Sequence, residues 1–217
     1  MLEPAIAPPF PLSWGFTTRQ DPPALQPPAR LIQVHGCDVV AAGERVQRAD
    51  GLWTRTPGLT IGTRVADCVP VLLAGPVLGQ PWVAALHAGW RGTVAGILRR
   101  AVALYRDQGG RPGDLVWALG PAIRACHFEV GDEVVEAARR DPAWRDELVR
   151  PGPRGRAHLD LPGLLQAQAL DLGLDPALDG SLPLCTYCDP EQFYSYRRGD
   201  RHLHQWCWIR IGPLKGY

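Results

Sequence analysis

The stretch CVPVLLAGPVLGQPWVAALHAGW, residues 68–90, contains no aspartate, glutamate, lysine or arginine. Its length would suffice to cross a bilayer. Proline and glycine interrupt it at Pro70, Gly75, Pro76, Gly79 and Pro81. Short apolar runs separated by a Gly/Pro turn are typical of strands that are buried on both faces. We therefore predict two buried strands joined by a turn, and no membrane span.

Helix and strand patterns alternate on both sides of this stretch. Apolar spacing and capping signals predict helices over 92–108 with Thr93 as cap, over 132–140, and over 162–172 between Asp160 and Gly173. Strands are predicted over 31–40, 59–74, 82–88 and 115–119, with one or two more over 193–211. Because these elements lack a strict βαβ rhythm, they predict an α+β fold with mixed sheets.

Length and charge limit the classes of protein that the chain can belong to. Its 217 residues suit a single domain, 1–217, whose residues 1–30 are proline-rich. The 23 basic and 22 acidic side chains leave a net charge of +1, too little to neutralise a polymeric nucleic acid. The N-terminus lacks the features of an export signal. We therefore expect a cytoplasmic protein whose six cysteines are thiols or metal ligands.

Three potential metal ligands lie at or near the ends of predicted strands, each close to a glycine or proline: His35, Cys68 and His87. Two imidazoles and one thiolate would make a zinc site with an open fourth position. A metal ion there would acidify bound water or polarise a substrate oxygen. The residues also allow two other interpretations. One is a buried cysteine with two hydrogen-bonded histidines, and the other is a Cys68 nucleophile with His87 as its base, oriented by Asp67 or another group.

Two segments carry groups that suit an anion or an aromatic ligand. Residues 87–92, HAGWRG, run from a strand into a helix, so their free N–H groups and Arg91 could bind phosphate. The glycines could equally serve only a tight turn. Gly120 follows another strand and could line the same pocket. In 193–198, FYSYRR, aromatic rings adjoin Arg197 and Arg198, which could bind phosphate or form a solvated strand edge.

The remaining cysteines carry weaker signals. Cys185 and Cys188 form a CxxC pair, which without a second pair is weak evidence for structural zinc. We expect Cys37, Cys126 and Cys207 to be small buried residues. His127 is expected to be a surface or hydrogen-bonded histidine.

Several motifs in fixed order carry a family resemblance: QVHG (33–36), ADCVPVLL (66–73), HAGWRG (87–92), GPAI (120–123) with FEVG (128–131), and CT (185–186) with FYSYRR (193–198). Over residues 14–210 the chain resembles the YfiH-like family. That family is also called the laccase-domain, polyphenol oxidase, purine nucleoside phosphorylase or peptidoglycan editing factor family. The resemblance implies a monomer with mixed sheets layered with helices. The segment between Arg19 and Gln33 is shorter here than in most members.

The resemblance also implies a function. It implies a zinc or copper site at His35, Cys68 and His87, phosphorolysis of adenosine, inosine, guanosine and methylthioadenosine, and deamination of adenosine. The partners would be a purine nucleoside and phosphate. We expect Asp67 to support the metal ligands. Substrate or phosphate contacts are expected at Arg19, Arg91, Gly120, Arg197 and Arg198. A copper-dependent polyphenol oxidase, a Cys-dependent hydrolase or editing factor acting on peptidoglycan precursors, and a binding protein without turnover are the alternatives.

Overall fold

The uncharged stretch forms the central hairpin of the fold in the computed structural model, which describes residues 1–21, 31–43 and 46–212. Strands β7 (Val69–Val77) and β8 (Gln80–Ala88) pair antiparallel along their whole length. Leu78 and Gly79 form the turn, both with positive φ, 49° and 76°. Two such residues give a turn whose twist matches that of the flanking strands. The predicted pair of buried strands is therefore confirmed. At the turn the strands extend further than predicted, to Val77 and from Gln80.

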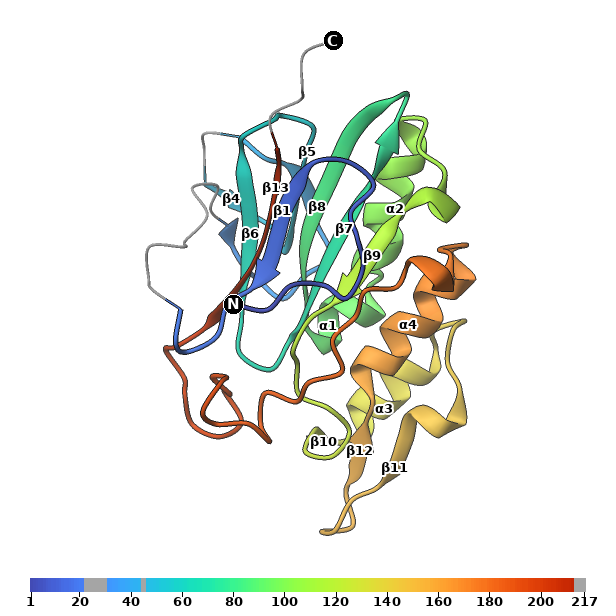
Figure 1. The fold of residues 1–217 in the computed structure, drawn as a ribbon. Helices are drawn as coiled ribbons and strands as arrows, with labels where there is room; N and C mark the ends of the chain where they lie inside the picture. The colour runs from blue at the N-terminus through green and yellow to red at the C-terminus, as the bar shows by residue number, and fades with distance from the viewer. Residues whose placement is uncertain (22–30, 44–45, 213–217) are drawn as a thin grey trace.

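The hairpin belongs to a central sheet, and a second sheet packs on one face of that sheet (Figure 1). The central sheet has the strand order β3 (Val39–Ala41), β5 (Gly51–Thr54), β8, β7 and β9 (Val116–Leu119). The second sheet has the order β1 (Leu12–Phe16), β13 (Gln205–Ile211) and β6 (Thr60–Val65). All neighbours in the two sheets run antiparallel except β3 and β5, which run parallel. The predicted α+β class with mixed sheets is confirmed.

Alternate residues of the hairpin enter two different cores. On β7, Val71 and Leu73 pack with the helices, whereas Leu72 and Ala74 pack with the second sheet. All four are fully buried. Because both faces of β7 are covered, its sequence is continuously apolar instead of alternating with polar residues. This double burial explains why the stretch carries no charge.

Helices lie on the other side of the central sheet: the first two along the chain pack on its strands, and the later ones pack against those two helices (Figure 1). The helices are α1 (Trp90–Val94), α2 (Ile97–Asp107), α3 (Asp132–Arg139) and α4 (Leu161–Asp171). The Asp160 side chain caps α4 by accepting from the Gly163 N–H, as predicted. Short 3-10 helices span Pro112–Asp114, Asp146–Leu148 and Pro176–Leu178.

Two small sheets complete the described structure. Strands β10 (Glu129–Val130), β12 (Ala157–Leu159) and β11 (Val149–Pro151) form an antiparallel sheet beside α3 (Figure 1). Strands β2 (Leu31–Ile32) and β4 (Gln47–Arg48) pair parallel. No helix in the described part of the chain is both long enough and apolar enough to span a membrane. The proline-rich segment 22–30 lies outside the described residues.

The predicted helix over 92–108 is wrong in one respect, because the chain forms two helices there. Gly96 adopts φ 86°, which a right-handed helix does not tolerate, so α1 ends and α2 begins around it. Thr93 does not cap: it lies inside α1, where its hydroxyl donates to the Gly89 carbonyl. The apolar spacing continues across the break, and for that reason the sequence pattern does not reveal it.

Three predicted strands are also interrupted. The strand over 59–74 is split into β6 and β7 by a bend at residues 66–68. The strand over 31–40 is split into β2 and β3 by a loop in which His35 has φ 59°. Of the region 193–211, only β13 is a strand, and turns occupy its first part. In the loop between β2 and β3 the His35 N–H donates to the Asp50 carboxylate, and in the C-terminal turns the Ser195 N–H donates to the Asp200 carboxylate. These backbone groups bond to side chains instead of to a neighbouring strand.

We expect Leu72→Ala to lower the free energy of unfolding by about 2–5 kcal/mol, because it leaves a cavity between the two sheets. Leu170→Ala is the control, since Leu170 lies on α4 with 50% of its surface exposed. Urea unfolding followed by circular dichroism measures both variants. Equal stability of the two would contradict the two-sided burial of β7.

Candidate metal centre and substrate pocket

Two loops and the end of strand β8 bring His35, Cys68 and His87 together. His35 lies between β2 and β3, Cys68 precedes β7, and His87 is near the end of β8. One ligand atom from each lies within 4.8 Å of the others. The two imidazole rings meet edge to face with 4.8 Å between centroids. His87 is buried and His35 is exposed, so the cluster opens at one side.

Two glycines of the HAGWRG segment allow these loops to approach. A Cβ at Gly89 would lie 3.1 Å from the Cys68 sulfur and 3.4 Å from the His35 ring. A Cβ at Gly92 would lie 2.5 Å from the carbonyl oxygen of Gly36, which is too close for any side chain. The glycines therefore serve the assembly of the ligand cluster. The following helix α1 has only five residues.

Asp50 orients two of the three ligands. Its buried carboxylate accepts hydrogen bonds from the backbone N–H groups of Val34, His35 and Gly36 at 3.2, 3.0 and 2.7 Å. His87 Nδ1 donates to the same carboxylate at 2.7 Å, which leaves Nε2 for a metal. Burial raises the pKa of Asp50, but the bonds from His87, Gly36 and Val34 outweigh it and lower that pKa.

Sequence reasoning missed Asp50 and expected this role at Asp67. A carboxylate that holds the second nitrogen of a histidine ligand is a common support of metal sites. Asp50 lies 37 residues before His87 and 15 after His35. The acidic residue directly before strand β5 was the available signal in the sequence. Its meaning depends on the pairing of β5 with β8, which places Gly51 opposite Leu86.

Cys68 and His87 polarise each other. Burial raises the pKa of Cys68, but His87 and His35 outweigh it and lower the pKa to about 7. Burial lowers the pKa of His87, but Cys68 and Asp50 outweigh it and raise the pKa to about 9. A thiolate beside an imidazolium also suits a cysteine nucleophile with a histidine base. The ion pair is therefore compatible with both interpretations of the trio.

The donor set itself fits a metal. Two imidazoles and one thiolate are borderline-soft ligands that suit zinc or copper. Three protein ligands leave a coordination position open, as in catalytic zinc sites. The Asp50–His87 bond supplies the usual outer support.

A pocket of about 530 Å³ opens over the three residues. Four exposed arginines line it: Arg64, Arg91, Arg197 and Arg201. None of them forms an ion pair with a carboxylate within residues 1–21, 31–43 and 46–212, and the one acidic residue on the wall is Asp67. The pocket is therefore positively charged. Arg64 and Arg201 were not predicted from the sequence.

Aromatic side chains form part of the same wall. Trp90, Phe128 and Tyr196 line the pocket, with Leu161 and Ile123 beside them. The guanidinium of Arg91 lies 4.4 Å from the Trp90 ring and that of Arg197 lies 5.6 Å from the Phe128 ring. A pocket of this size with cations and aromatic faces can hold a flat ring and an anionic group together.

Asp67 stabilises the part of the pocket wall that the C-terminal loop forms. Its carboxylate accepts from the Thr186 and Ser195 hydroxyls at 2.6 and 3.0 Å, and from the Arg197 N–H at 2.8 Å. The residue adopts φ 86°. Its carboxylate therefore fixes the C-terminal loop, and it does not support the metal ligands as expected.

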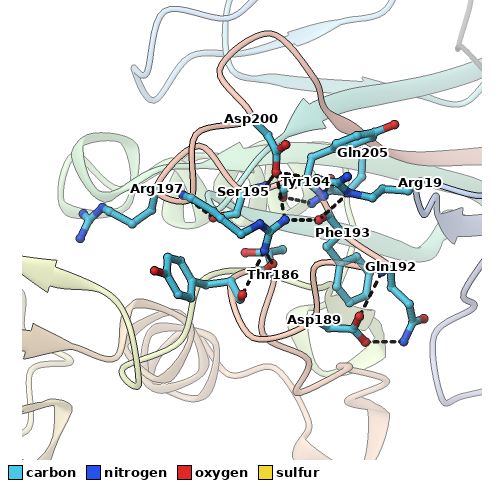
Figure 2. A network of polar contacts seen from close by, with 12 residues as sticks. Arg19, Thr186, Asp189, Gln192, Phe193, Tyr194, Ser195, Arg197, Asp200 and Gln205 are labelled. Carbon is cyan, nitrogen blue, oxygen red and sulfur yellow. Dashed lines mark hydrogen bonds and ion pairs between the residues drawn. The ribbon is translucent and has the colours of Figure 1, made fainter.

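Three predicted substrate contacts have structural partners instead. Figure 2 shows Arg19 and Asp200 inside the polar network of the C-terminal loop, with the Arg197 side chain pointing away from it. Asp200 accepts from Arg19 at 2.6 Å and from Arg198 at 2.9 Å. Gly120 packs on the Phe16 ring, where a Cβ would lie 2.3 Å away. Of the predicted contacts, Arg91 and Arg197 line the pocket, and Arg19, Arg198 and Gly120 do not.

The fold and the pocket define a class of α+β proteins with a His-Cys-His cluster in a cationic pocket. The family model described as multi-copper polyphenol oxidoreductase laccase matches residues 23–208. The chain belongs to this laccase-like YfiH family, as its motifs indicated. The structure of YlmD from Geobacillus stearothermophilus superposes with a TM-score of 0.82 at 28% identity, covering 95% of this chain and 94% of that one.

Its relatives are named as enzymes. A purine nucleoside phosphorylase of Pseudomonas aeruginosa is 41% identical over 178 residues, which cover 80% of this chain and 70% of the relative. One of Deinococcus radiodurans is 40% identical over 172 residues, covering 78% and 64%. Adenosine deaminase RL5, from an unknown prokaryotic organism, is 36% identical over 179 residues, covering 76% and 68%.

We expect Asp50→Asn to weaken zinc binding at the trio by roughly 10- to 100-fold, because the amide cannot replace the charge that orients His87. Competition with a chromophoric chelator measures the affinity. Asp38→Asn is the matched control, because the Asp38 side chain is 61% exposed. Equal zinc affinity in both variants would mean that Asp50 does not support a metal site.

Proposed function

We propose that this pocket catalyses phosphorolysis of purine nucleosides, as the names of the relatives suggest. The observation that carries the proposal is the arrangement of four arginines and three aromatic rings around the His-Cys-His cluster. In the described part of the chain no carboxylate forms an ion pair with these arginines. The reaction needs a site for an anion and a site for a flat base at one centre. The pocket offers both.

The arginines suit the phosphate. Guanidinium groups bind phosphate oxygens through two parallel hydrogen bonds. Arg91 follows the glycine turn beside Cys68, and Arg201 comes from the opposite C-terminal loop. Phosphate held between them would lie next to the ligand cluster.

The aromatic wall suits the nucleoside. Phe128 and Tyr196 come from two different segments and line one pocket with Trp90. Purine rings stack on aromatic side chains and on guanidinium planes. Tyr196 is 59% exposed, so part of its surface is free for a ligand.

In the reaction a phosphate oxygen forms a bond to the anomeric carbon of the ribose, and the bond from that carbon to the purine nitrogen breaks. The electron pair of the broken bond leaves with the purine, which takes up a proton. The products are the free base and ribose 1-phosphate. Arg91 and Arg201 would hold the phosphate in position for attack. A zinc or copper ion held by His35, Cys68 and His87 would supply a Lewis acid.

Deamination of adenosine is a second activity that the same site would support. A relative named adenosine deaminase is 36% identical to the chain, and the trio leaves a coordination position open. Water would replace the amino group of the purine, giving inosine and ammonia. His87, held by Asp50 through Nδ1, would serve this reaction as a metal ligand through Nε2.

Incubation of the zinc-loaded protein with adenosine or inosine, with and without phosphate, tests the proposal. We expect free base and ribose 1-phosphate only when phosphate is present, and their loss after chelation and in His35→Ala. Chromatography of the products separates the alternatives. Inosine without free base indicates deamination alone. No turnover of any nucleoside by the metal-replete protein would refute the proposal and leave phenol oxidation or Cys68-dependent hydrolysis to be tested.

Removal of a pocket arginine has a distinct expected effect. We expect Arg91→Ala or Arg201→Ala to raise the KM for phosphate roughly 10-fold or more, because a lost charged hydrogen bond costs about 1.5 kcal/mol. Arg111→Ala is the control, since its side chain is 87% exposed and its carboxylate neighbour is Asp114, outside the pocket. An unchanged KM for phosphate in both pocket variants would move the anion site elsewhere.

A further inference from the structure

A second cluster of metal-ligand side chains lies outside the pocket, at the surface. The Cys126 sulfur lies 3.4 Å from the Cys185 sulfur and 3.5 Å from the Cys188 sulfur. The Cys188 sulfur lies 3.3 Å from Nδ1 of His127. One ligand atom from each of the four residues lies within 4.8 Å of the others. Three sulfurs and one imidazole nitrogen therefore surround a common point.

We propose that Cys126, His127, Cys185 and Cys188 bind one zinc ion in a closed structural site. Three thiolates and one imidazole form a tetrahedral ligand set that zinc commonly uses. Thiolates are soft ligands, and a set rich in them disfavours magnesium, calcium and manganese. With four protein ligands no position is left open, so the ion stabilises the fold and takes no part in catalysis.

The distances between the sulfurs fit a shared metal better than a disulfide. Two sulfurs bound to one zinc at 2.3 Å and at a tetrahedral angle lie roughly 3.8 Å apart. The observed separations of 3.4 and 3.5 Å require shifts of only a few tenths of an ångström. A disulfide requires about 2.05 Å. It would also leave the third thiol and His127 without a role.

The backbone holds the two halves of the cluster together before any metal binds. The Ala122 N–H donates to the Leu184 carbonyl at 3.2 Å, and the Thr186 N–H donates to the Ala122 carbonyl at 3.1 Å. The His127 N–H donates to the Arg124 carbonyl at 2.9 Å, which closes the turn that carries Cys126. A preformed arrangement lowers the entropic cost of assembling four ligands.

A zinc ion here would fasten two walls of the substrate pocket to each other. The segment that carries Cys126 also carries Ile123 and Phe128, and the segment after Cys188 carries Tyr196 and Arg197. Arg198 already reaches back and donates to the Thr186 and Tyr187 carbonyls at 2.9 and 3.0 Å. The sequence alone shows only the CxxC pair, because its partners Cys126 and His127 lie 59 and 58 residues before Cys185.

Zinc stoichiometry of the full chain tests the proposal. After loading with zinc and removal of free metal, we expect two zinc ions per chain by elemental analysis. Cys126→Ser with Cys188→Ser should retain one, and Cys68→Ala should also retain one, because each lacks a different site. The combined variant should retain none. Cys37→Ser is the control and should retain two, since Cys37 belongs to neither cluster.

Cobalt spectroscopy covers the case in which the Cys126/Cys188 variant fails to fold. In cobalt-loaded Cys68→Ala the second cluster is the thiolate site that remains, so an intense thiolate-to-cobalt absorption and a tetrahedral d–d band are expected. Intact mass of the same protein reports any disulfide as the loss of two hydrogens. Two results would overturn the proposal: Cys68→Ala that shows neither band after loading with cobalt, or an intact mass that reports a Cys126–Cys185 disulfide. Loss of zinc from the first site alone would refute only the trio.

Discussion

The arrangement of His35 and His87 depends on the hydrogen bonds of the Asp50 carboxylate. This carboxylate is fully buried and binds three consecutive backbone N–H groups of one loop together with the ring of His87 on β8. A buried carboxylate is costly unless its lone pairs are satisfied. Here its partners are the loop that carries His35 and the ring of His87. The hydrogen bonds that satisfy the Asp50 carboxylate therefore also bring His35 and His87 together.

Asp67 holds the C-terminal loop of the pocket by hydrogen bonds, as Asp50 holds the loop of His35 and the ring of His87. It lies directly before Cys68, yet its carboxylate holds Thr186, Ser195 and the Arg197 backbone. Asp200 continues the network by accepting from Arg19 and Arg198 (Figure 2). Three acids thus shape a site that has little negative charge of its own. Arg19 and Arg198 are held by Asp200, whereas the arginines that line the pocket form no ion pair with a carboxylate among the described residues.

The buried core positions the loops, and the loops carry the side chains of the pocket. The two-sided core around β7 and β8 fixes the strand ends, and close contacts at Gly89 and Gly92 bring the loops together. The second cysteine cluster would add a metal clamp between the pocket walls. A small protein rich in turns gains most from such clamps, because its loops bury little apolar surface of their own.

Sequence patterns determined the fold class, the buried hairpin, the helices α3 and α4 and the family, because burial on both faces and helix caps leave local signals. They also singled out His35, Cys68 and His87 through their motifs. Tertiary structure decided what local signals do not carry. The positive φ of Gly96 divides the predicted helix into α1 and α2. The pairing of β5 with β8 places Asp50, and not Asp67, beside His87. Arg19 and Arg198 donate to Asp200 and do not line the pocket. Cys126, predicted to be buried, is exposed beside a CxxC pair. The roles of Asp50, Arg19 and Cys126 depend on contacts between segments distant in the chain, which periodicity and composition cannot encode.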